Sequence, residues 1–178
     1  PLHALTAKGH FCDTAYDKLA DCVKAVADYP HIRVINVEAF DFDNAGASIR
    51  QELGYALAIG TEYMSALTDR GIAADEVARR IKFTFAIGGN YFFQIAKFRA
   101  ARVLWANIVK AYGIECGCAQ KIKVHAVTSA WNQTVYDAYV NMLRGTTEAM
   151  SAAIAGVDSM EVLPFDYAFR APGEFSHR

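Results

Sequence analysis

The sequence predicts an α/β fold in which short hydrophobic strands alternate with longer helices. The hydrophobic period switches repeatedly between helical and strand-like values, and three strand-like runs are each followed by a long helical stretch. Hydrophobic residues make up 53% of the chain, which indicates elements that are buried on more than one face. Alternation of this kind predicts a parallel sheet with right-handed crossovers.

The predicted elements start with a helix and end with a strand. We expect helices over residues 13–29, 47–70, 73–79, 90–112 and 135–155, and strands over residues 33–39, 81–87, 122–128 and 159–163. Pro30 ends the first helix, Gly71 stops the second, and Gly88-Gly89 forms a turn.

Helical spacing also predicts which residues face the core. In the helix over 90–112 the predicted inward face holds Phe93, Ala96, Ala100, Val103, Leu104 and Ile108. Its charged residues are assigned to a solvated or partner-facing surface, namely Lys97, Arg99, Arg102 and Lys110. In the helix over 135–155 the predicted inward residues are Tyr139, Met142, Leu143, Met150 and Ile154.

Composition narrows the classes of function. The net charge of −1 gives no support for binding nucleic acid or an anionic membrane. No run is long and apolar enough to span a bilayer and the start shows no signal-peptide pattern, so we expect a cytoplasmic protein. Cys116 and Cys118 form a C-x-C pair without a second pair or nearby histidines, so we expect reduced loop thiols and no metal site.

The chain is long enough for one domain, but it is short for a closed barrel. A (β/α)8 barrel typically needs about 250 residues, and this chain of 178 residues supplies about half of one. The last predicted strand has no following helix and the first helix has no preceding strand, so both ends are expected to be cuts through a larger architecture. No internal repeat or linker divides residues 1–178.

Several motifs, in order, give the chain a family resemblance. They include Asn44-Ala-Gly-Ala-Ser48, Glu52-Leu-Gly-Tyr-Ala-Leu-Ala58, Phe85-Ala-Ile-Gly-Gly-Asn-Tyr-Phe-Phe93, Ile95-Ala-Lys-Phe-Arg-Ala-Ala-Arg-Val-Leu-Trp105, Thr128-Ser-Ala-Trp131 and Arg144-Gly-Thr-Thr-Glu-Ala-Met150. With these motifs the chain resembles the coenzyme-B12-dependent acyl-CoA mutases, methylmalonyl-CoA mutase above all. The resemblance covers residue 32 to the end.

The resemblance implies an architecture. Mutase chains of this family fold as a (β/α)8 TIM-type barrel that encloses the acyl-CoA, followed by a cobalamin-binding domain. The match lies in the later half of that barrel, so residues 1–178 are expected to be a partial barrel of the substrate domain. The cobalamin-binding domain is expected to be absent, since its Asp-x-His-x-x-Gly motif does not occur in this sequence.

The resemblance also locates candidate site residues, beginning after the first strand. Where catalytic relatives carry a Tyr-His pair that contacts the substrate thioester, this chain has Phe40-Asp41. An ionised carboxylate cannot donate a hydrogen bond to a carbonyl oxygen, so the exchange opposes the family's chemistry. Read independently, Asp41 and Asp43 are two residues apart on one strand face and could bind magnesium or act as an acid–base pair. We favour a solvated or capping acidic turn ahead of a helix.

Two further positions retain a family residue and are the predicted substrate-binding residues. Arg80 matches an arginine that contacts the coenzyme A phosphates, although Lys82 replaces a serine beside it. His125 matches a histidine that faces substrate, although Val127 replaces the accompanying glutamine. Ordinary structural alternatives stay open for both: a charged run at a strand entrance and a satisfied core histidine.

Together the replacements predict a supporting chain. The run ending Leu163-Pro164-Phe165 resembles the small, non-catalytic subunit of heterodimeric methylmalonyl-CoA mutase. That resemblance implies a large catalytic subunit as partner, adenosylcobalamin carried by that subunit, and no catalytic, cofactor-binding or metal-binding residue on this chain. The alternatives are an active mutase for another acyl-CoA and a module that self-associates through unpaired strand edges.

Overall fold

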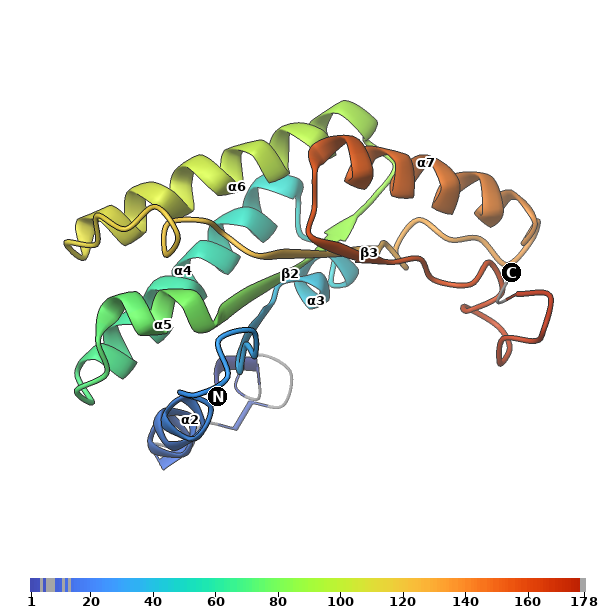
Figure 1. Ribbon diagram of the computed structural model, residues 1–178. Coiled ribbons are helices and arrows are strands. Elements are labelled where there is room, and N and C mark those ends of the chain that lie inside the picture. Colours follow the sequence, from blue (N-terminus) through green and yellow to red (C-terminus); the bar gives the residue numbers. More distant parts are fainter. Residues whose placement is uncertain (4, 6–8, 11, 13, 177–178) are drawn as a thin grey trace. The chain divides into compact units, whose positions relative to one another are not determined.

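The computed structural model describes residues 1–3, 5, 9–10, 12 and 14–176 (Figure 1). Its helices are α2 (Thr14–Ala25), α3 (Phe40–Asn44), α4 (Ile49–Thr68), α5 (Ala74–Arg80), α6 (Tyr91–Ala111) and α7 (Val140–Ala155). Its strands are β1 (Ile35–Glu38), β2 (Ile81–Ile87), β3 (Val124–Thr128) and β4 (Ser159–Glu161). No helix built from the described residues is long and apolar enough to cross a membrane.

The strands form one four-stranded parallel sheet in the order β1-β2-β3-β4. In the β3–β4 pair, His125, Ala126 and Val127 lie opposite Ser159, Met160 and Glu161. The predicted α/β class with a parallel sheet is confirmed, and closure into a TIM-type barrel stays a prediction.

The chain divides into two compact units. The first unit comprises Pro1–Glu38, Leu53–Phe83 and Ala100–Lys123, and the second comprises Ala39–Glu52, Thr84–Arg99 and Val124–Arg178.

The core of the first unit contains a buried aromatic pair. Phe83 and Trp105 are fully buried and pack edge-to-face, with ring centroids 4.8 Å apart. Gly60 of α4 lies directly against these rings, since a Cβ there would sit 2.8 Å from Phe83 Cζ and 2.9 Å from Trp105 Cζ3. The absence of a side chain at Gly60 therefore lets the helix approach the rings closely.

In the second unit the structure corrects the predicted inward face of α7. The predicted inward residues Tyr139, Met142, Leu143, Met150 and Ile154 are all exposed. The buried residues of α7 are instead polar or small: Asn141, Gly145, Glu148, Ser151, Ala152 and Ala155. The prediction was wrong because it took the apolar stripe as the inward one. This helix packs through small residues and through hydrogen bonds between its buried polar side chains and residues outside the helix.

The predicted inward face of α6 was also partly wrong. Phe93, Val103 and Leu104 are exposed, whereas Lys97 is 3% exposed although it was assigned to the surface. A lysine is buried in this way only when its charge has a partner, and Lys97 has one in Glu52.

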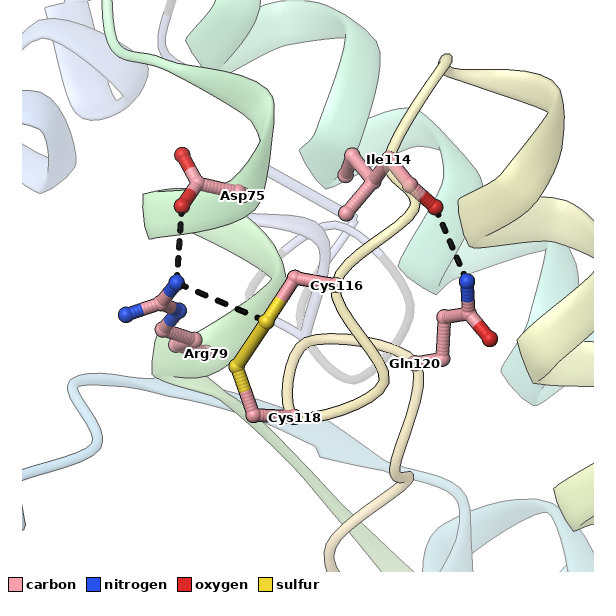
Figure 2. The surroundings of a disulfide bond; sticks show 6 residues. All are labelled: Asp75, Arg79, Ile114, Cys116, Cys118 and Gln120. Atoms are coloured by element: carbon pink, nitrogen blue, oxygen red, sulfur yellow. Dashed lines mark hydrogen bonds and ion pairs between the residues drawn. A yellow bond between two sulfur atoms is a disulfide. The ribbon is translucent and has the colours of Figure 1, made fainter.

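The expectation of reduced thiols at Cys116 and Cys118 was wrong as well. The structure joins them in a disulfide whose Cα atoms are 5.4 Å apart (Figure 2). The chain turns tightly here because the N–H groups of Ala119 and Gln120 both donate to the carbonyl of Cys116. That turn brings the two sulfurs within bonding reach.

Candidate functional site

A pocket of about 610 Å³ lies within the second unit, at the carboxyl ends of its strands. Three connections line the pocket. The segment after β1 contributes Asp43 and Ser48, the segment after β2 contributes Asn90 and Gln94, and the segment after β3 contributes Ser129, Trp131 and Asn132. The carboxyl ends of parallel strands are where α/β folds place their binding sites, so this pocket is the candidate site.

Asp43 ties two of these connections together. Ser129 Oγ donates a hydrogen bond to Asp43 Oδ2 at 2.6 Å. Asp43 lies on α3, so Asp41 and Asp43 do not share the strand face on which the magnesium and acid–base hypothesis depended. Among the described residues no cluster of three or more His, Cys, Asp and Glu side chains could hold a metal ion.

Trp131, which lines the pocket, rests against Gly46. Gly46 adopts a φ of +90°, a backbone conformation that side chains rarely adopt. A Cβ there would lie 3.6 Å from the Trp131 ring, which is itself 68% exposed. Gly46 therefore provides both the sharp exit from α3 and the surface against which the indole rests.

Next to these connections lies a buried ion pair. Lys97 Nζ donates to Glu52 Oε2 and to the carbonyl of Ala86, each at 2.7 Å, and Ala86 N donates to Glu52 Oε1 at 2.8 Å. Burial lowers the pKa of Lys97 and raises the pKa of Glu52, and their mutual attraction opposes both shifts. The pair fixes α4 and α6 to both backbone polar groups of one β2 residue.

A second set of polar contacts is centred on Glu148 of α7. Asn132 Nδ2 donates to Glu148 Oε1 at 2.5 Å, and Arg144 Nη1 donates to the Asn132 carbonyl at 2.6 Å. Burial raises the pKa of Glu148 to about 7, although the Asn132 hydrogen bond opposes the shift. The carboxyl group is therefore near the midpoint of its titration at neutral pH.

Two amide oxygens at the pocket find no hydrogen-bond partner among the described residues. They are Gln94 Oε1, in a side chain only 2% exposed, and Asn132 Oδ1. Buried acceptors of this kind are normally satisfied by protein, water or a ligand. The pocket is thus equipped to accept hydrogen bonds from a polar molecule.

The predicted substrate-binding residue Arg80 lies in the first unit and is 3% exposed. Its guanidinium donates to the carbonyls of Tyr29, Ile32 and Ala27. Its Nε also forms an ion pair with Glu76 at 2.7 Å. These contacts anchor the connection between α2 and β1.

The other predicted residue, His125, lies on β3 in the second unit. Its Nδ1 is 2.8 Å from Ser159 Oγ, and its Nε2 is 4.0 Å from Glu161 Oε2. The histidine thus contacts two β4 residues, while Val127, two residues further along β3, is buried. Arg80 belongs to the first unit and His125 to the second.

Sequence reasoning missed the residues that shape the second unit. Asn141 receives a hydrogen bond from Thr134 N and donates to the carbonyls of Thr134 and Phe165. These bonds hold residues 134–139 outside the helix, with turns over 136–139, so α7 begins at Val140 and not at Val135. The only signal was a set of polar residues that helical spacing places opposite the apolar stripe.

Comparison with known proteins shows which proteins this chain is similar to. The methylmalonyl-CoA mutase family model matches residues 5–178. The chain is 57% identical over 155 residues to the methylmalonyl-CoA mutase small subunit of Porphyromonas gingivalis, covering 86% of this chain and 25% of that protein. It is 39% identical over 166 residues to the small subunit of Streptomyces virginiae, covering 93% of this chain and 27% of that protein.

A large subunit is also similar. Over 149 residues the chain is 39% identical to the methylmalonyl-CoA mutase large subunit of P. gingivalis, covering 84% of this chain and 21% of that protein. The chain therefore spans about a quarter of the length of the curated relatives that it matches.

Proposed function

The chain belongs to the methylmalonyl-CoA mutase family, and we propose that it is part of the small subunit of a heterodimeric methylmalonyl-CoA mutase. Such an enzyme is an isomerase that interconverts methylmalonyl-CoA and succinyl-CoA by a radical rearrangement. In this proposal the large subunit performs the chemistry, and this chain supports it without doing chemistry of its own.

The difference between two similarities from one organism carries the assignment to the small subunit. Identity is 57% to the small subunit of P. gingivalis and 39% to its large subunit. The similarities do not favour the alternative of an active mutase for another acyl-CoA.

The surroundings of the two retained family residues support a non-catalytic role. The guanidinium of Arg80 donates hydrogen bonds to three backbone carbonyls and to Glu76, and His125 contacts Ser159. Groups committed to the fold in this way have few donors left for a substrate. Substrate binding by Arg80 and His125 stays a prediction.

The family is generally B12-dependent, and we place adenosylcobalamin on the large subunit. This chain lacks the Asp-x-His-x-x-Gly motif, and the described residues hold no His, Cys, Asp and Glu cluster fit for a metal. Cytoplasmic location and absence of the cobalamin domain stay predictions.

The exposed face of α7 supports a partner. Met142, Leu143, Met150 and Ile154 are between 43% and 69% exposed. Large apolar side chains grouped on one helix are typical of a surface that another protein segment covers. We propose that the covering segment belongs to the assembled heterodimer, and self-association of this chain stays a prediction.

The proposal is tested by purifying the small subunit with and without the large subunit and assaying mutase turnover. We expect no turnover from the small subunit alone, and turnover from the complex. Leu143→Asp is expected to weaken assembly, whereas Ala58→Asp adds the same charge at an exposed position of another helix, α4, and serves as the control. Turnover by the small subunit alone would contradict the proposal.

A further inference from the structure

The disulfide between Cys116 and Cys118 lies in the loop after α6, in the first unit (Figure 2). We propose that this pair is a thiol–disulfide exchange site for small thiols of the glutathione class. In this assignment Cys118 is the sulfur that is attacked, and Cys116 is the thiolate that leaves toward Arg79.

The segment that carries the disulfide lies at the surface of the first unit. Cys116, Gly117 and Cys118 are all exposed. A Cβ placed on Gly117 would meet no heavy atom within 4 Å, so nothing crowds the residue between the two cysteines. Access and thiolate character decide which disulfides react, and access is met here.

The loop holds the two cysteines together by contacts that do not involve sulfur. Ala119 N and Gln120 N donate to the Cys116 carbonyl, at 3.1 Å and 3.3 Å. Gln120 Nε2 donates to the Ile114 carbonyl at 2.9 Å, and Ala119 is 1% exposed. The turn therefore persists after reduction and keeps the thiols ready to pair again.

Arg79 makes the two sulfurs chemically different. Its Nη2 is 3.9 Å from Cys116 Sγ and 3.0 Å from Asp75 Oδ2, as Figure 2 shows. Asp75 thus orients the guanidinium beside one sulfur of the pair. A neighbouring guanidinium stabilises a thiolate, and the more stable thiolate is the better leaving group.

The exchange balances in two steps. A thiolate RS⁻ attacks Cys118 Sγ, forming an R–S–S–Cys118 mixed disulfide and breaking the bond to Cys116, whose sulfur takes the electron pair as a thiolate. A second RS⁻ attacks the R sulfur, forming RSSR and releasing the Cys118 thiolate, which takes a proton from water. The protein gains two electrons and two thiols of the glutathione class are oxidised.

Stabilisation of the fold does not explain this disulfide. A cross-link restricts the unfolded chain more as the loop it closes becomes longer. Only Gly117 separates these cysteines, so the loop is among the shortest possible. Exchange chemistry gives a role to the exposed position of the cysteines and to the adjacent guanidinium. Stabilisation of the fold would need neither feature.

The test is a redox titration of the full chain with mixtures of reduced and oxidised glutathione. Free thiols are blocked with N-ethylmaleimide and the chain is cut with trypsin. The cysteines fall on the tryptic peptide over 111–121, separate from the free Cys12 and Cys22. We expect this peptide to convert fully and reversibly between a disulfide form and a doubly alkylated form without denaturant.

Rates in variants test the role of Arg79. Arg79→Gln is expected to slow reduction by glutathione about tenfold, whereas Arg99→Gln, which removes another exposed guanidinium, leaves the rate unchanged. In single-cysteine variants, Cys116 in Cys118→Ser is expected to react faster with oxidised glutathione than Cys118 in Cys116→Ser. The proposal is overturned by a pair that stays reduced in oxidised glutathione, by reduction that needs denaturant, or by equal rates in Arg79→Gln and the parent chain.

Discussion

The two units of this chain bury different kinds of side chain. Arg80 is the one buried polar or charged side chain among the described residues of the first unit. The second unit buries Glu52, Thr84, Gln94, Lys97, Thr128, Ser129, Asn141, Glu148, Ser151 and Asp166. The buried side chains of the first unit are mainly apolar, whereas the second unit also buries many hydrogen-bonded polar groups.

This difference follows the direction of the strands. The second unit contains the carboxyl ends of β2 and β3, where α/β folds place their binding sites, and the candidate pocket lies there. Buried polar groups stabilise a fold only when each has its partner, so this end of the sheet is sensitive to single substitutions.

The largest effect is expected at the buried ion pair. Lys97→Met leaves Glu52 buried without its counter-charge, and removal of one partner from such a pair costs about 3–5 kcal/mol. Urea unfolding at pH 7 measures the loss. Lys110→Met, at an exposed position of the same helix, is the control and should change stability by less than about 0.5 kcal/mol. Equal stabilities of the two variants would show that the second unit does not depend on its polar core.

A smaller, pH-dependent effect is expected at Glu148. Its ordinary pKa is 4.5, and burial raises the pKa to about 7 in the folded chain. The unfolded chain therefore releases this proton first, and stability is lost as pH rises through the folded-state pKa. The full shift corresponds to about 3 kcal/mol. Because solvent partly screens the group, we expect a penalty of roughly 2 kcal/mol at pH 8 that is largely absent near pH 4.5.

Glu148→Gln tests this effect, because a glutamine oxygen can still accept from Asn132 but does not ionise. The variant should match the parent chain near pH 4.5 and exceed its stability at pH 8. Chemical unfolding at several pH values gives the difference between the two profiles. If the stabilities of the variant and the parent chain change with pH in parallel, the ionisation of Glu148 does not affect the stability of the second unit.

The sequence predicted the periodic elements well and the polar contacts poorly. The predicted strand over 81–87 coincides with β2, and the predicted helix over 47–70 contains α4. These elements follow from hydrophobic period and from glycine stops, which are local signals. The predicted acidic turn after β1 is instead the short helix α3, and Asp43 is tied to Ser129, 86 residues away in the sequence.

The errors share one physical cause. Lys97 was predicted at the surface because charge favours water, and its burial depends on Glu52, 45 residues earlier in the chain. The inward face of α7 was wrong because Asn141 and Glu148 find partners outside the helix. One sequence does not show which polar side chains meet, so apolar spacing alone misplaces a helix that packs through hydrogen bonds.

The smallest effect is expected in α4, where buried Gly60 and exposed Gly54 make a matched pair. Gly60→Ala gains helix propensity of about 1 kcal/mol. Its Cβ would lie 2.8 Å from Phe83 Cζ, however, and overpacking costs about 1–3 kcal/mol. We expect a net loss of about 1 kcal/mol, because the buried rings of Phe83 and Trp105 have little room to move.

Gly54→Ala should have the opposite sign, since a Cβ there meets nothing within 4 Å and the position is exposed. Only the gain in helix propensity remains, so stability should rise by up to about 1 kcal/mol. Urea unfolding of both variants against the parent chain measures the contrast. If both substitutions stabilise the chain, the first unit is loosely packed around Gly60, and its contrast with the polar second unit is one of composition and not of packing density.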